Sequence, residues 1–311
     1  MTKMLTEDAS GVYIICATPF TEEGAVDHDD LDGLVEFYLD HGVSGMTILG
    51  MMGEAPKLTP DEAQGIVTRI MRRVDGRVPV VVGVSNAGLN NLATLTKFSM
   101  DAGAAGIMVA PQSASKTDAG VEAYFDAVVS AVGGNVPVCY QDFPLTTDMP
   151  ISPAAFTRIV QTHPSVVMLK HEDWPGLPKL TQVRAQAEST GARRVSVLCG
   201  NGGLYLPQEL ARGADGAMTG FAYPEMLVQV VRRWHEGDHD GAEDLFDAYL
   251  PLVRHEQQPG FGLAVRKEVL RRRGVIKTAK ARAPGPSLDR AGHVELTRLM
   301  DRLERKLEAV A

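Results

Sequence analysis

The chain has 311 residues, of which 44% are hydrophobic and 23% are charged. This composition is ordinary for a globular protein with one large domain or two average ones. The formal net charge of -8 argues against nucleic acid and anionic membranes as general partners. Residues 1–8 contain no hydrophobic signal segment and no stretch is apolar enough to span a membrane, so we expect a cytoplasmic protein.

Eight short apolar segments predict β-strands, and longer segments with helical spacing of apolar residues lie between them. Among the latter, residues 29–40 have a helical period, and Thr59-Pro60 and Ser152-Pro153 are typical helix starts. The predicted strands cover residues 12–18, 46–50, 78–84, 106–110, 136–140, 166–170, 195–199 and 216–219.

Apolar strands that are each followed by a helix indicate an α/β protein with parallel strands buried on both faces. Eight such units within residues 1–235 predict a (β/α)₈ TIM barrel. The alternative is a doubly wound sheet, which would need a glycine-rich dinucleotide loop where this chain has Ala17-Thr18-Pro19-Phe20. Residues 236–311 predict a helical extension packed on the barrel, with helices at 241–253, 262–273 and 288–310.

The three cysteines, Cys16, Cys139 and Cys199, are widely spaced and each lies in an apolar run. An odd count with such spacing argues against a disulfide framework and against a zinc site. We therefore expect packing residues of the core in a reducing compartment.

One lysine stands at the end of a strongly apolar strand, because Val166-Val167-Met168-Leu169 leads directly into Lys170. Apolar surroundings disfavour the charged form of lysine, so we expect its pKa to fall. A neutral amine attacks carbonyl groups, which makes Lys170 a candidate Schiff-base nucleophile. Tyr140 ends another apolar strand and is the candidate proton shuttle. The alternative is a structural lysine that extends its amine to solvent.

In a (β/α)₈ barrel the active site forms at the carboxyl ends of the strands. Polar residues and glycines follow the predicted strands at this face, which a purely structural barrel would not require. They include Thr18, the loop Gly50-Met51-Met52-Gly53, Gln112, Tyr140-Gln141-Asp142, Lys170-His171-Glu172-Asp173 and Gly200-Asn201.

In the order and spacing of its motifs, the chain resembles the dihydrodipicolinate synthase / N-acetylneuraminate lyase family along nearly its whole length. The resemblance implies a cofactor-free lyase acting on small 2-oxo acids, assembled as a homo-oligomer, either a tetramer or a dimer. The matching segments are Ala17-Thr18-Pro19-Phe20, Gly50-x-x-Gly53-Glu54, Tyr140, Lys170 and Gly213-Ala214-Asp215-Gly216-Ala217.

The same resemblance implies roles for individual residues. Lys170 would form an imine with the ketone carbon of pyruvate or a larger 2-oxo acid. The protonated imine would then permit a C–C bond to break or form, or water to be lost. Tyr140 would relay protons, and Gly200 would line the pocket. The backbone N–H groups of residues 50–53 would bind the substrate carboxylate.

Three departures from the family pattern concern the substrate. Met51 and Met52 replace two threonines, no arginine follows strand five to hold a second carboxylate, and Gln112-Ser113 replaces an aromatic pair after strand four. We therefore do not expect a true dihydrodipicolinate synthase. Polar Gln112, Gln141 and Asp142 suit a hydroxylated substrate such as a 2-keto-3-deoxy sugar acid, whereas the methionines leave room for an apolar or aromatic tail.

Residues 171–173 leave further alternatives open. His171, Glu172 and Asp173 could be the ligands of a metal-dependent aldolase, or a solvated loop that caps the next helix. If the strand continues, Lys170 and Glu172 share one face and the other two share the opposite face, so we expect Glu172 to reach the pocket. The other alternative is a non-catalytic 2-oxo acid-binding or regulatory protein that kept the pocket without turnover.

Overall fold

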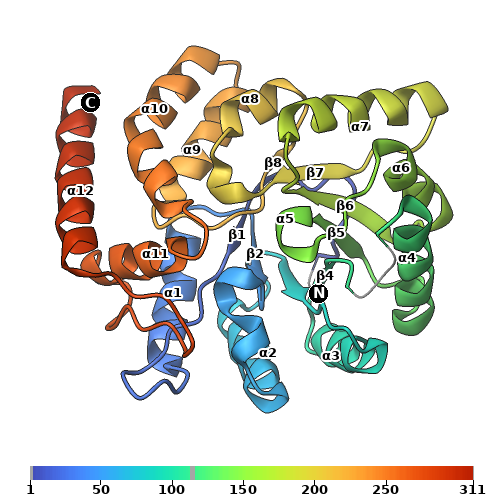
Figure 1. Ribbon diagram of the computed structural model, residues 1–311, viewed down its shortest axis with the longest axis horizontal. Helices are drawn as coiled ribbons and strands as arrows, with labels where there is room; N and C mark the ends of the chain where they lie inside the picture. Colours follow the sequence, from blue (N-terminus) through green and yellow to red (C-terminus); the bar gives the residue numbers. More distant parts are fainter. Residues whose placement is uncertain (1–2, 113–115, 311) are drawn as a thin grey trace.

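Eight parallel strands close into a barrel in sequence order (Figure 1). The predicted (β/α)₈ TIM barrel is therefore confirmed. The computed structural model describes residues 3–112 and 116–310. Its strands are β1 (Gly11–Ile15), β2 (Gly45–Ile48), β3 (Val80–Gly83), β4 (Gly106–Val109), β5 (Val138–Asp142), β6 (Val166–His171), β7 (Ser196–Cys199) and β8 (Gly216–Ala217).

Helices follow the strands and surround the barrel (Figure 1). Both predicted helix starts are confirmed. Thr59 and Glu62 form a reciprocal capping box before α2, and Ser152 caps α6. The barrel helices are α1 (His28–Asp40), α2 (Pro60–Val74), α3 (Leu89–Asp101), α4 (Asp118–Val132), α5 (Pro144–Thr147), α6 (Pro153–Thr162), α7 (Gly176–Thr190), α8 (Leu206–Ala211) and α9 (Pro224–His235), with short 3₁₀ turns η1 (Met51–Gly53), η2 (Ala55–Lys57) and η3 (Asn201–Gly203).

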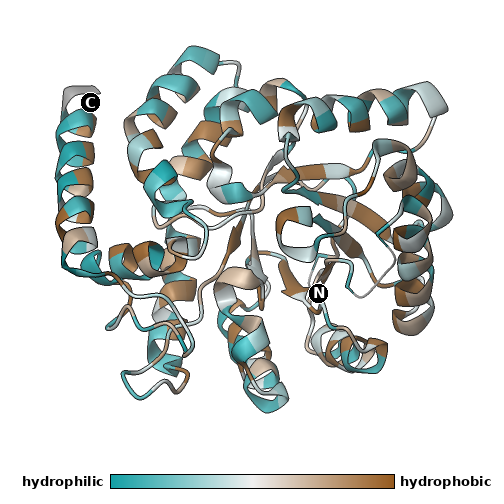
Figure 2. Cartoon of the chain, viewed as in Figure 1, coloured by the Kyte–Doolittle hydropathy of each residue, from teal (hydrophilic) through white to brown (hydrophobic). Residues whose placement is uncertain are grey.

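Side chains alternate between the inside of the barrel and the layer between strands and helices. The interior cluster contains Cys139 of β5 and Met168 of β6, whereas their neighbours Tyr140 and Leu169 belong to the outer cluster. Figure 2 shows the strands as largely hydrophobic, as expected for strands buried on both faces. This alternation decides which residues at the strand ends can share a site.

Two strands extend beyond their predicted carboxyl ends, and the added residues matter for the site. β5 and β6 continue to Asp142 and His171, because Gln141 pairs with Lys170 and Asp142 pairs with His171 in parallel register. β1 ends earlier than predicted, at Ile15, and the side chain of Thr18 beyond it bonds to the loop that follows β2. All three cysteines are buried and free, as expected for packing residues.

Three helices follow the barrel: α10 (His239–Glu256), α11 (Gly262–Arg272) and α12 (Arg290–Val310). α10 packs on α9, and α12 packs on α10 at the edge of the molecule (Figure 1). In the part of the chain that the structure describes, no helix combines the length and the apolar character needed to cross a membrane.

Candidate active site

Lys170 points into the barrel near the carboxyl end of β6. It is only 4% exposed, and it lies two residues after Met168 of the interior cluster. Its Nζ is 2.9 Å from Oε2 of Glu172. The two residues share a face because β6 continues past Lys170, as the period of a strand predicts. A buried amine is thus held beside a buried carboxylate.

Glu172 is held in place by the two neighbouring strands. Nε2 of Gln141, in β5, donates to its Oε2 at 2.7 Å. On the other side, after β7, the Asn201 backbone N–H faces Oε1 at 3.5 Å and its side-chain amide donates to the Glu172 carbonyl at 3.0 Å. The carboxylate therefore has a fixed position next to the amine, where it can take up or release a proton.

Gly200 leaves the space that this carboxylate occupies. A Cβ on Gly200 would lie 2.2 Å from Cγ of Glu172 and 2.4 Å from its Oε1, which is far inside van der Waals contact. The family resemblance implies that Gly200 lines the pocket. In the structure it lies directly against the side chain of Glu172.

The structure does not bring Tyr140 to Lys170, so the predicted proton shuttle is wrong. Tyr140 points out of the barrel and packs against Phe125 and Phe156, with ring centroids 4.6 and 5.7 Å away. Its buried hydroxyl has no hydrogen-bond partner among the described residues. Burial raises its pKa well above the ordinary value, so it stays protonated. Gln141 occupies the inward position instead, because successive strand residues face opposite sides.

The variant Tyr140→Phe tests this correction. Removing a buried hydroxyl that has no partner leaves no other polar group unpaired, so we expect little change in stability. A proton shuttle contributes about 10²–10⁴-fold to the rate, whereas we expect kcat to stay within about twofold. Steady-state kinetics on the substrate that the native protein turns over checks it. A hundredfold loss would restore Tyr140 to the mechanism.

Asp142 also faces outward, so its predicted contact with substrate is wrong. Its Oδ2 is 2.6 Å from Nζ of Lys179 on α7, and the same amine is 2.8 Å from Asp173. His171 lies in this outer layer too, with Nδ1 3.9 Å from Asp142 and Nε2 2.9 Å from the carbonyl oxygen of Gly176. These four charged or titratable side chains stabilise the ends of β5 and β6 from behind.

A fifth titratable residue, Glu209 of α8, is buried in the same outer layer. Burial raises its pKa to about 7, and His171 acts in the opposite direction. Burial acts to lower the pKa of His171, but the nearby carboxylate of Asp142 outweighs it, so the net pKa is raised. Spacing along the sequence gave no sign of Lys179 or Glu209, because both come from helices that pack behind the strands.

The predicted alternative of a metal site at His171, Glu172 and Asp173 is not assembled. Glu172 faces the barrel interior, while His171 and Asp173 make their contacts in the outer layer. Opposite faces of a strand cannot supply ligands to one ion. Elsewhere in residues 3–112 and 116–310, no group of three or more His, Cys, Asp or Glu side chains could hold a metal.

The loop after β2 forms the short turn η1. Thr18 donates its hydroxyl to the carbonyl of Gly53 at 2.7 Å, which joins the β1 and β2 loops. The Gly53 N–H returns to the carbonyl of Gly50 at 3.1 Å. The first N–H groups of such a turn, those of Met51 and Met52, have no acceptor within it. They can therefore serve an anionic group.

The two methionines differ in burial, and two aromatic residues are exposed on other loops. Met52 packs against the interior cluster, whereas Met51 is 48% exposed. Trp174, after β6, and Tyr205, after η3, are each 40% exposed and lie edge to face with centroids 5.3 Å apart. No pattern in the sequence predicted this pair. Gln112 is half-buried after β4, next to residues outside the described part of the chain.

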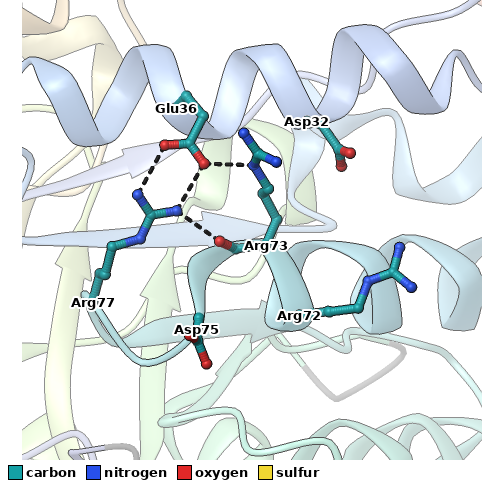
Figure 3. A pocket seen from close by; sticks show the side chains of 6 residues that line it. All are labelled: Asp32, Glu36, Arg72, Arg73, Asp75 and Arg77. Carbon is teal, nitrogen blue, oxygen red and sulfur yellow. Dashed lines mark hydrogen bonds and ion pairs between the residues drawn. The ribbon is translucent and has the colours of Figure 1, made fainter.

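A surface pocket of about 380 Å³ between α1 and α2 contains none of these residues (Figure 3). Glu36 accepts hydrogen bonds from Arg73 and Arg77, and these lower its pKa to about 2. Three basic and three acidic residues balance one another there. We interpret it as a solvated ion-pair cluster lined by Asp32, Glu36, Arg72, Arg73, Asp75 and Arg77.

The chain is similar to known proteins along nearly its whole length. The model of the dihydrodipicolinate synthetase family matches residues 8–303. An L-2-keto-3-deoxyarabonate dehydratase from Azospirillum brasilense is 29% identical over 308 residues, which are 98% of this chain and 97% of the relative. A 4-hydroxy-tetrahydrodipicolinate synthase from Sorangium cellulosum is 31% identical over 307 residues, covering 96% of this chain and 98% of the relative.

Solved structures agree with the fold. A dihydrodipicolinate synthase from Rhodopseudomonas palustris is 45% identical with a TM-score of 0.94, covering 97% of this chain and 100% of that one. A family protein from E. coli K12, solved in complex with pyruvate, is 25% identical with a TM-score of 0.86, covering 95% of this chain and 98% of that one.

Proposed function

Because the chain belongs to the dihydrodipicolinate synthetase family, we propose that it is a class I lyase in which Lys170 forms a Schiff base with a 2-oxo acid. The observation that carries this proposal is the buried amine of Lys170, 2.9 Å from the carboxylate of Glu172. Nucleophile and proton carrier lie within direct reach of each other, which is the geometry that covalent catalysis needs.

Lys170 and Glu172 can carry out the covalent and proton-transfer steps of such a reaction. The neutral amine of Lys170 attacks the ketone carbon of the substrate, and water leaves to give the imine. The protonated imine withdraws electrons from the neighbouring carbon, so Glu172 can remove a proton there. Hydroxide then leaves the next carbon and takes that proton from Glu172. The net loss is one water molecule, which is dehydration. In the aldol direction a C–C bond breaks instead. Hydrolysis of the imine frees Lys170.

The substrate that we propose is a 2-keto-3-deoxy sugar acid, and dehydration is the proposed reaction. The similarity to the dehydratase of Azospirillum brasilense supports this choice. Backbone N–H groups of residues 50–53 would hold the carboxylate, and Thr18 would support that loop. Gln112, Gln141 and Asn201 are polar groups for substrate hydroxyls. No arginine lies between residues 141 and 147 to bind a second carboxylate, so we do not propose dihydrodipicolinate synthesis.

A second candidate is a 2-oxo acid with an apolar or aromatic tail. Met51 and Met52 after β2, together with the exposed Trp174–Tyr205 pair after β6 and β7, favour it. For either substrate we propose a cytoplasmic homo-oligomer, a dimer or a tetramer, as the family resemblance implies. Light scattering of the purified protein measures that state.

Borohydride trapping with pyruvate tests the mechanism. We expect intact mass to show one reduced pyruvyl adduct, peptide mapping to place it on Lys170, and Lys170→Ala to form none. Lys116→Ala changes an exposed lysine and serves as the control. The absence of an adduct with pyruvate and with larger 2-oxo acids would sink the Schiff-base proposal. An adduct without turnover across a panel of hydroxylated and aryl-substituted 2-oxo acids would favour a non-catalytic binding protein.

A further inference from the structure

Three consecutive charged residues of α11 are buried. Arg266, Lys267 and Glu268 are 2%, 0% and 3% exposed. Charged side chains are almost never fully buried unless they are paired. Apolar residues of similar volume would pack this helix against the barrel at least as well. The pairing of these charges therefore needs an explanation beyond packing.

Lys267 reaches the loop that follows the candidate carboxylate-binding turn. Its Nζ is 2.6 Å from Oε1 of Glu54 and donates to the carbonyl of Lys280 at 2.8 Å. It also lies over the ring of Phe20, 4.4 Å from the centroid. Burial lowers the pKa of Lys267, and Glu54 acts against that shift. The contact joins residues 213 positions apart in the chain.

Glu54 ends the turn η1 in an unusual conformation. Its φ is +55°, in the left-handed region that non-glycine residues seldom adopt. Its second carboxylate oxygen accepts from Nζ of Lys57 at 3.0 Å and from the backbone N–H of Arg282 at 3.0 Å. Two of its three donors thus come from the C-terminal extension. These contacts fix the position at which the 50–53 loop ends.

The same extension reaches two other strand ends. Arg266 pairs with Glu256 of α10 and donates to the carbonyl of Gly220 after β8. A Cβ on Gly220 would lie 2.1 Å from Nη1 of Arg266, so the guanidinium packs directly against this glycine. After β1, the ring of Phe20 contacts two cations of the extension, since the guanidinium carbon of Arg282 is 4.5 Å and the amine of Lys267 is 4.4 Å from its centroid.

We propose that Lys267 is a positioning residue for the loop of residues 50–53, so that the C-terminal extension is a functional part of the active site. The proposal rests on the proposed function, in which the Met51 and Met52 N–H groups of that loop bind the substrate carboxylate. A loop with its anchor removed binds that carboxylate less well. The chemistry at Lys170 and Glu172, on the other side of the barrel, proceeds once substrate is bound.

The test compares Lys267→Met, the double variant Glu54→Gln/Lys267→Met, and the control Lys277→Met. Lys277 lies in the same extension, but its side chain is 63% exposed. The double variant leaves no unpaired buried charge and is expected to fold. We expect its KM to rise about tenfold with kcat within about twofold, the pattern of lost ground-state binding. We also expect faster hydrogen exchange of amides 50–55, and no change in the control.

A native KM and native loop exchange in the folded double variant would overturn the proposal, because the pair would then serve stability alone. If both Lys267 variants fail to fold, Glu54→Gln decides, because it removes the charge that Lys267 holds and keeps the size of the side chain. Native KM in that variant would also contradict the proposal. If the native protein forms no borohydride adduct, the proposed function fails, while hydrogen exchange of the loop still decides whether Lys267 positions it.

Discussion

Glu172→Gln is expected to keep borohydride trapping at Lys170 and to lose turnover. The amide retains the size of the side chain and its contact with Gln141, so the site keeps its shape. It cannot take up a proton, and positioned acid–base groups contribute about 10²–10⁴-fold to a rate. We therefore expect kcat to fall by that factor, with the adduct on Lys170 still found by peptide mapping.

Gly200→Ala examines the same carboxylate from a different direction. The new methyl group would displace Glu172, since its Cβ would lie 2.2 Å from Cγ of that residue. Gly134→Ala is the matched control, because nothing lies within 4 Å of its added Cβ. We expect kcat to fall in Gly200→Ala only. Native turnover in both Glu172→Gln and Gly200→Ala would remove Glu172 from the mechanism.

Lys179→Met is expected to lower the free energy of unfolding by about 3–5 kcal/mol, the usual effect of removing one partner of a buried ion pair. The reason is Asp142, whose side chain is fully buried 2.6 Å from the lysine amine. Without Lys179, the buried carboxylate keeps only His171 as a nearby titratable partner. Urea unfolding followed by circular dichroism measures the loss.

Two further variants test whether the loss of stability comes from the unpaired buried charge. The double variant Asp142→Asn/Lys179→Met removes both charges and is expected to recover most of the stability. Lys97→Met breaks a pair with Asp101 whose side chains are 78% and 65% exposed, so we expect a change below about 1 kcal/mol. If Lys179→Met lowered the free energy of unfolding as little as Lys97→Met, the buried ion pair of Asp142 and Lys179 would not contribute to stability.

Much of the site at β6 was predictable from the sequence, because a strand has a period of two residues. The apolar run before Lys170 indicated a buried strand end, and alternation then placed Glu172 on the same face. The barrel itself followed from eight apolar segments, each with a helix after it. Both features are set by residues that are close together in the chain, so the sequence alone is enough to predict them.

The same reasoning could not decide whether the side chain of Tyr140 faces the barrel interior. An apolar strand buried on both faces has no polar face to mark its orientation, so either phase of the alternation fits Val138-Cys139-Tyr140. The parallel register with β6 decides it, by pairing Gln141 with Lys170. The same register turns Asp142 outward to Lys179. A shift of one residue would have reversed every one of these assignments.

By itself the sequence determined the barrel, the buried lysine and the carboxylate two residues after it, since local hydrophobic pattern and strand period specify these features. Only the tertiary structure decided which residue of β5 faces Lys170, what lies behind Asp142, and that Lys267 holds Glu54. Each of these depends on contacts between segments far apart in the chain. Such contacts follow from strand register and helix packing, which no local pattern encodes.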